Sequence, residues 1–141
     1  MYIVKLDSNG NYVWHGVLGN QAGDTNEGID AIHVNNNLLY ISGDYSGTLV
    51  GTGTAANIAT WTGNISTSNG NQDALLMQLS ADDGSFKWAR SLGGSDYDTG
   101  DSFAQDDASN VYFAGQFKNT IDLDPTAAEL KVTTKDQTFL A

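Results

Sequence analysis

The residues that could do chemistry are concentrated in the segment 96–101. Asp96, Asp98 and Asp101 place three carboxylates within six residues, with Gly100 among them. Ca²⁺ is bound in proteins by several oxygen ligands, commonly from acidic loops. The segment is therefore a candidate calcium site, although it is not an EF-hand, because Gly100 occupies the third ligand position. The alternative is that the three are solvated carboxylates in turns, which keep the protein soluble and protect sheet edges.

Trp61 is the second candidate. It lies between Thr60 and Thr62 in a stretch rich in Gly, Thr and Asn. An exposed indole beside hydroxyl groups is suited to stacking on a sugar ring, so a glycan is a candidate ligand. The alternative is a strand aromatic that packs on its own sheet.

No arrangement of residues predicts a catalytic centre. The sequence shows no Ser-His-Asp order, no phosphate-binding loop and no cluster of histidines. Aspartates are abundant, but no pair is marked out as an acid and a base. The sequence therefore favours a non-catalytic role and leaves enzymatic activity open.

Composition excludes several classes of protein. The 141 residues include 17 acidic and six basic side chains, and the net charge of −11 repels nucleic acid. The chain has no cysteine, which excludes disulfides, thiolate zinc sites and cysteine nucleophiles. No apolar run approaches the roughly 18 residues of a membrane-spanning helix, so we expect no membrane span.

The segments that must position the candidate residues are repeated along the chain. Three pairs of segments match: 6–19 with 79–93, 39–43 with 111–115, and 73–77 with 136–141. The matches predict two repeat units, residues 1–72 and 73–135, and the opening of a third unit at 136–141.

Within each unit apolar residues alternate with a period of two, which is typical of β-strands. The expected strands are 2–7, 11–18, 29–34 and 38–43 in the first unit, and 74–80, 85–92, 102–106 and 110–116 in the second. Turns rich in Asn, Asp and Gly separate the strands of each hairpin. The linkers 44–72 and 116–135 are expected to include some strand.

A four-stranded antiparallel sheet that repeats along a chain is the blade of a β-propeller. We therefore expect an all-β partial propeller with blades at 1–72 and 73–135, and the first strand of a third blade at 136–141. A blade cannot bury both of its faces alone, so Trp14 and Trp88 are expected at equivalent positions between neighbouring blades. Because a closed propeller takes about four to eight blades, the expected partners are further blades of the same chain or identical copies of it.

The motifs in these strands resemble the bacterial SBBP β-propeller repeat over essentially the whole chain. The resemblance rests on Lys5-Leu6-Asp7-x-x-Gly10-Asn11-x-x-Trp14, Leu18-Gly19 and Tyr40-x-x-Gly43, with Leu92-Gly93-Gly94, Asn110-Val111-Tyr112 and Gly115 in the second unit. Asp122-Leu123-Asp124-Pro125 is similar to the Asp-Phe-Asp-Pro signature of such repeats, whereas Val50 and its neighbours stand in its place in the first unit. The resemblance implies a propeller in a large secreted or surface-displayed bacterial protein, often of no assigned activity. We therefore expect a structural or binding module, with a glycan or a protein as its candidate ligand. Met1 is not followed by a signal-peptide pattern, so we expect either a chain that is not exported or an internal piece of something longer.

A second resemblance implies a different function. Asp82-Asp83-Gly84-x-x-x-Trp88 is similar to the core of quinoprotein propeller repeats, which bind a quinone cofactor and calcium, commonly beside a vicinal cysteine pair. This chain lacks the cysteines. The alternative to a non-catalytic module is therefore a fragment of a propeller enzyme, quinoprotein-like or glycan-active, whose active residues lie elsewhere.

Overall fold

The computed structural model describes residues 1–20, 27–56, 61, 65, 67–126 and 128–134. The described residues form strands β1 (Tyr2–Leu6), β2 (Tyr12–Asn20), β3 (Gly28–Asn35), β4 (Leu38–Tyr45), β5 (Leu49–Gly53), β6 (Asp73–Ser80), β7 (Phe86–Gly94), β8 (Asp98–Gln105), β9 (Val111–Phe117), β10 (Thr120–Asp122) and β11 (Lys131–Thr133). The expectation of an all-β fold is confirmed for these residues.

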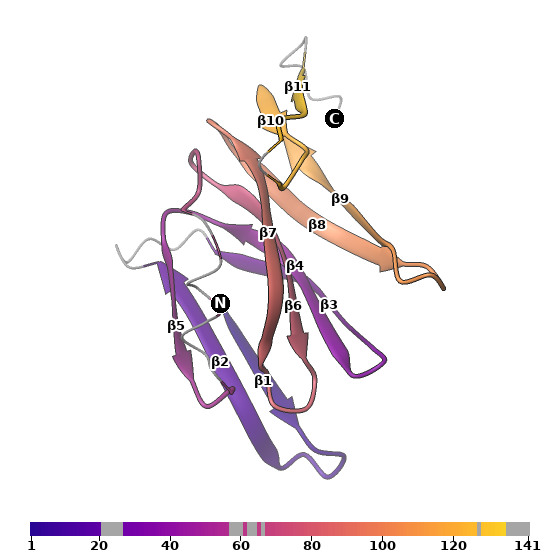
Figure 1. Ribbon diagram of the computed structural model, residues 1–141. Helices are drawn as coiled ribbons and strands as arrows, with labels where there is room; N and C mark the ends of the chain where they lie inside the picture. The colour runs from indigo at the N-terminus through magenta and orange to yellow at the C-terminus, as the bar shows by residue number, and fades with distance from the viewer. Residues whose placement is uncertain (21–26, 57–60, 62–64, 66, 127, 135–141) are drawn as a thin grey trace, which may run out of the picture.

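The strands form three antiparallel sheets, none of which closes on itself in the described part of the chain. Their strand orders are β1-β2-β5, β11-β10-β7-β6-β4-β3 and β8-β9. Figure 1 shows the six-stranded sheet in the middle, with β1-β2-β5 on one side of it and β8-β9 on the other. We call the three the N-terminal sheet, the central sheet and the C-terminal sheet.

Burial patterns follow from this layering. Strands β4 and β6 of the central sheet are buried on both faces, because another sheet packs on each side of them. In β1, by contrast, Ile3 is buried while Tyr2 and Val4 on the opposite face are exposed. One continuous core therefore fills the space between the N-terminal and central sheets. It includes Ile3, Trp14, Leu18 and Leu49 from the first sheet and Leu39, Ile41, Leu75, Met77 and Leu79 from the second.

The two repeat units share their pairing registers. Trp14 of β2 lies opposite Lys5 of β1, and Trp88 of β7 lies opposite Gln78 of β6. In both hairpins the register shifts at the next residue of the first strand. The same irregularity at the same place makes β1-β2 and β6-β7 equivalent hairpins, in agreement with the repeat read from the sequence.

The sheets do not coincide with the repeat units. Strand β4 of the first unit pairs with β6 of the second along eight residue pairs, from Leu38 with Ser80 to Tyr45 with Asp73. The central sheet therefore crosses the expected boundary between residues 72 and 73, and β2 and β3 are in different sheets. This differs from the expected grouping of four consecutive strands per sheet. Alternation within a strand determines its two faces, but it carries no information about which strand lies along each edge.

The bounds of the eight expected strands agree with the structure to within two residues, with one exception. Strand β8 begins at Asp98 and not at 102, because a bulge between Thr99 and Ser102 interrupts the alternation that marks a strand. At the bulge, a Cβ on Gly100 would lie 2.4 Å from the Phe113 ring, so only glycine permits this close approach. The linkers 44–72 and 116–135 contain β5, β10 and β11, which confirms that they include some strand. The expected strand at 136–141 lies outside the described residues.

Candidate functional site

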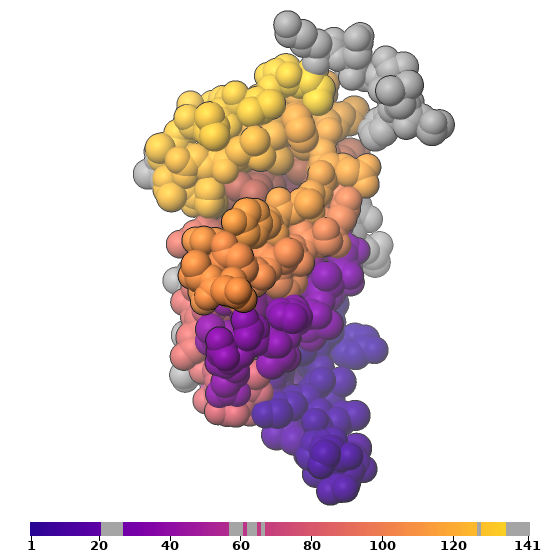
Figure 2. Space-filling model, turned by 90° about the vertical axis from the view of Figure 1, so that its right-hand side faces the viewer, coloured from indigo at the N-terminus to yellow at the C-terminus, as the bar shows by residue number. Residues whose placement is uncertain are grey.

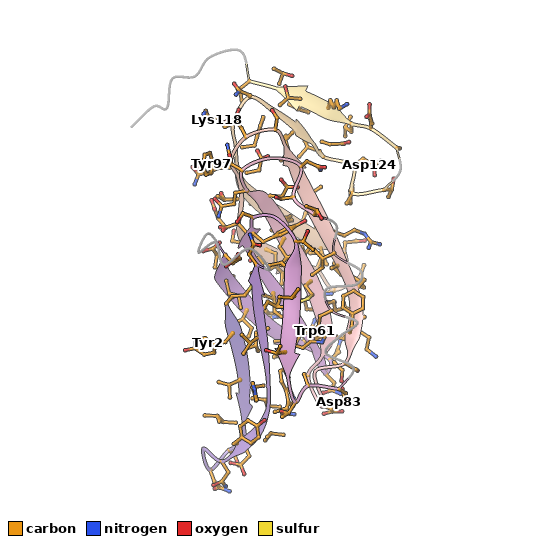
Figure 3. All side chains as sticks on the ribbon, turned by 90° about the vertical axis from the view of Figure 1, so that its left-hand side faces the viewer. Tyr2, Trp61, Asp83, Tyr97, Lys118 and Asp124 are labelled. Carbon is orange, nitrogen blue, oxygen red and sulfur yellow. The ribbon has the colours of Figure 1, made fainter. Side chains whose placement is uncertain are left out.

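Trp61 is fully buried in the core between the N-terminal and central sheets. Its indole Nε1–H donates a hydrogen bond to the carbonyl oxygen of Gly84, at 2.9 Å. Figure 3 shows Trp61 inside the layered structure and Tyr2 pointing away from it. A buried indole offers no face to a sugar ring, so this geometry corresponds to the packing role and not to a stacking platform.

The three candidate calcium ligands have different hydrogen-bond partners. Asp96 forms an ion pair with Lys118 at 3.0 Å and accepts from the side-chain amide of Asn119. Its pKa is lowered, first by the hydrogen bond from Lys118. Asp101 accepts hydrogen bonds from Thr99 and Gln116.

Asp98 is the member of this group that the fold buries completely. It accepts hydrogen bonds from the backbone N–H groups of Gly94 and Lys118, and burial raises its pKa. Asp73 is also fully buried, and burial raises its pKa as well. Two buried carboxylates with raised pKa values therefore lie close together where β6, β7 and β8 meet.

The expected calcium site gains no support from this arrangement. Across the described ranges, no three His, Asp or Glu side chains are grouped so that they could hold a metal ion. The partners of Asp96 and Asp101 fit the alternative reading, in which the carboxylates satisfy turns and sheet ends. The same role recurs in Asp7 and Asp106, each of which accepts backbone N–H hydrogen bonds from residues two and four positions further along.

An acidic pocket of about 380 Å³ lies where the central and C-terminal sheets meet. It is lined by Asp30, Asp44, Tyr97, Thr99, Asp101, Gln116, Phe117 and Lys118. Burial, and then the charge of Asp30, raise the pKa of Asp44 to about 6. Asp44 also accepts a hydrogen bond from the amide of Gln72. Sequence reasoning missed Asp44, for which the available signal was its place as the one charged residue of β4.

An apolar groove of about 430 Å³ runs beside the outer edge of β1. It is lined by Ile3, Val4, Lys5, Leu6, Trp14, Ile32, Val34, Asn37, Leu39 and Ala81. The groove lies between the edge of β1 and the exposed face of β3, on which Ile32 and Val34 are more than half exposed. The groove thus brings exposed apolar side chains of β3 to the unpaired edge of β1, a combination that suits an added strand.

Equivalent positions in the two units can be compared with and without a covering sheet. In β6 the side chains that face the N-terminal sheet are at most 1 % exposed: Leu75, Met77 and Leu79. Their counterparts in β1 are 73 %, 45 % and 52 % exposed: Tyr2, Val4 and Leu6. The repeat therefore carries core residues on a face of β1 that nothing in the described structure covers.

On the side of the C-terminal sheet, it is the residue of the second unit that is the more exposed of each equivalent pair. Tyr40 of β4 is 2 % exposed and packs on Phe103 of β8, with ring centroids 5.7 Å apart. Tyr112, its counterpart in β9, is 61 % exposed. Trp88 is half-buried beside Tyr40, whereas its counterpart Trp14 is buried and donates a hydrogen bond to the carbonyl oxygen of Asp82 at 3.0 Å. Figure 2 shows β9, in orange, on the surface of the molecule.

No protein-family model, curated protein or solved structure matches the chain. In the part of the chain that the structure describes, no helix has the length and apolar character needed to cross a membrane.

Proposed function

We propose that this chain is a non-catalytic structural module of the β-propeller type, in which stacked sheets bury one another's faces. An exported or surface-displayed bacterial protein is the setting that the SBBP-like motifs imply. The function of the module is to add sheets to a larger stack and to present loops from it.

The observation that carries the proposal is the difference in exposure between equivalent strands. Leu75, Met77 and Leu79 are core residues, and the repeat places Tyr2, Val4 and Leu6 at the same positions on an open face. Burying large apolar side chains stabilises a fold by roughly 1.5 to 3 kcal/mol each. A module whose sequence carries core residues on an open face is suited to a neighbouring sheet.

The sheet pattern supports the same conclusion. The run β3-β4-β6-β7-β10 combines two strands of the first unit with three of the second. The N-terminal sheet, β1-β2-β5, has the equivalents of the last three strands, and the C-terminal sheet, β8-β9, has the equivalents of the first two. Each outer sheet thus corresponds to a part of the central sheet, and the two parts together would make one five-stranded sheet.

A tandem fusion tests the proposal. Asp136 aligns with Asp73, and Met1 follows it in the phase of Ala74, so joining residue 136 of one copy to Met1 of a second preserves the repeat. In the fusion, β9 of the first copy can lie beside β1 of the second. We expect the amide hydrogens of residues 2–6 in the second copy to exchange at least about tenfold more slowly than in the single chain, because strand pairing protects them.

The control is built into the fusion. The comparison is made at low salt and at a concentration where the single chain and the fusion are both monomeric, so residues 2–6 of the first copy have no strand beside them and should exchange as in the single chain. Equal exchange in both copies would contradict the proposal, since it would mean that a further repeat does not cover the open face.

A further inference from the structure

The geometry points to a specific interface between identical copies: β9 of one copy pairs with β1 of the next, and Tyr112 fills the groove beside β1. This inference rests on the proposed function and adds the partner, the strands and their register. The occupant to which we commit is the β8-β9 hairpin of a second copy.

The template for the interface is the pairing of β4 with β6 inside the chain. Strand β9 is the counterpart of β4, and β1 is the counterpart of β6. Both β1 and β9 lie at the edge of their sheets and, among the described strands, each has a paired neighbour on one side only. An edge strand presents unpaired backbone N–H and C=O groups, which another strand can satisfy by adding to the sheet.

Transferring the register of β4 and β6 fixes the pairs. Leu39 lies opposite Leu79, and Tyr40 lies opposite Gln78. The corresponding pairs across the interface are Val111 with Leu6 and Tyr112 with Lys5. A shift by one residue would turn the apolar side chains of β9 to the other face, so the register is strongly specified.

The groove offers the surface that Tyr112 needs. Within the chain, Tyr40 packs on Phe103 of the C-terminal sheet. Phe103 lies opposite Phe113 as Ile32 lies opposite Ile41, so Ile32 is the counterpart of Phe103. Tyr112 in the paired position would therefore pack on Ile32, which is 56 % exposed and lines the groove.

An interface of this kind joins two different surfaces of the molecule. It is head-to-tail, so repeated copies form a ring when the rotation closes and a filament when it does not. The net charge of −11 opposes association of identical copies, and added salt should therefore promote assembly.

The test uses the whole chain and two substitutions, one on each of the two surfaces that form the interface. Ile32→Lys blocks the groove and leaves β9 intact, whereas Tyr112→Lys removes the inserted ring and leaves the groove intact. Both side chains are more than half exposed, so neither substitution removes a core residue. Leu130→Lys is the matched control, because Leu130 is 57 % exposed and lies away from both surfaces.

Light scattering coupled to size-exclusion chromatography, in about 0.5 M salt to screen the charge, measures the outcome. We expect the native chain and Leu130→Lys to assemble with concentration, and each of the other variants alone to associate at least about tenfold more weakly. Mixing Ile32→Lys with Tyr112→Lys should restore association, and the product should stop at a 1:1 dimer, because only one intact groove and one intact hairpin can meet.

Three results would overturn the inference: a native chain that stays monomeric, single variants that assemble as the native chain does, or a mixture that forms no dimer. A monomeric native chain together with slowed exchange in the tandem fusion would reject pairing between copies while leaving the proposed module intact.

Discussion

At the scale of residues, the aspartates divide into two groups by their surroundings. Asp7 and Asp106 are exposed, and their pKa values are lowered first by the side-chain amides of Asn11 and Asn110 and then by backbone N–H groups. Asp73 and Asp98 are buried, and loss of water raises theirs. One residue type thus builds the turns in its ionised form and is costly to ionise where it joins the sheets.

Asp44 gives a prediction for pH dependence. Its pKa of about 6 in the fold lies above the usual value of 3.8. The folded state therefore binds this proton more tightly than the unfolded state, and the stability that this provides is complete below about pH 4 and is lost as the pH rises through 6. In Asp44→Asn the charge never forms, so the variant should gain stability relative to the native chain as the pH rises from 4 to 7.

Urea denaturation at pH 4, 5, 6 and 7 measures this difference in the free energy of unfolding. Asp30→Asn is an informative companion, because the charge of Asp30 contributes to the raised pKa of Asp44 and its removal should reproduce part of the gain. A difference between Asp44→Asn and the native chain that does not change between pH 4 and 7 would contradict the assignment.

At the scale of elements, the turn between β6 and β7 is where the N-terminal sheet is attached to the central sheet. The carbonyl oxygen of Asp82 accepts hydrogen bonds from the Trp14 indole and from Lys5, and that of Gly84 accepts from Trp61. At the equivalent turn between β1 and β2, by contrast, no atom of the described structure lies within 4 Å of a Cβ built on Gly10. Two turns of one design therefore have different neighbours.

Gly84 and Gly10 provide a matched pair for testing this contact. Both have a positive φ, at 71° and 83°, so alanine costs about 1 to 2 kcal/mol at either position. A Cβ on Gly84 would also lie 2.7 Å from the Cβ of Ala55 and 3.2 Å from the Trp14 ring, whereas nothing lies within 4 Å at Gly10. Overpacking typically costs a further 1 to 3 kcal/mol or so, so Gly84→Ala should lose clearly more stability than Gly10→Ala.

Chemical denaturation of the two variants measures the comparison. Tryptophan fluorescence, to which Trp14 and Trp61 beside Gly84 both contribute, reports whether this contact has changed. Equal losses in the free energy of unfolding would mean that the contacts of Gly84 with Ala55 and Trp14 do not constrain the turn between β6 and β7. In the tandem fusion, Gly10 of the second copy should behave like Gly84, since the Trp88 side chain of the first copy would then lie against it.

The sequence predicted the strands better than the sheets. The alternation around Trp14 and Trp88 located both hairpins and their equivalence, because strand periodicity is a local property. The pairing of β4 with β6 depends on how two hairpins dock across a long linker, and no local pattern encodes it. Trp61 illustrates the same limit, since Thr60 and Thr62 suggest an exposed position while the burial of the indole depends on two distant sheets.

Candidate chemistry was harder to predict than the fold for a related reason. The spacing of Asp96, Asp98 and Asp101 suggests a common ligand only if all three lie on one loop. Strand β8 continues across the bulge at Gly100 back to Asp98, so the three carboxylates do not share one loop and have different partners. Asp44 and Asp101, which are far apart in sequence, line one pocket because β4 and β8 pack together.

At the scale of the whole molecule, the two outer sheets are complementary in strand content and in exposed side chains. Sheet edges that are long and unprotected are a liability, which natural proteins cover or block. Here the edge of β1 carries apolar residues on its open face, and it runs beside a groove. A strand from a neighbouring repeat would satisfy the backbone groups and cover the apolar surface at once.

The register of that strand can be tested by cross-linking, because the chain contains no cysteine that could compete. Val111 and Leu6 are expected to lie directly opposite each other, as Leu39 and Leu79 do within the chain. Opposite residues in antiparallel strands have Cα atoms about 4.5 to 5.5 Å apart, a separation that a disulfide can span. Oxidising a mixture of Val111→Cys and Leu6→Cys copies should therefore give linked pairs containing one copy of each variant.

Lys5→Cys is the control, since its side chain points to the opposite face of β1 and should link to Val111→Cys at least about tenfold less. Mass spectrometry of the non-reduced products counts the mixed pairs, and equal yields from Leu6→Cys and Lys5→Cys would show that the strands meet in another register or not at all.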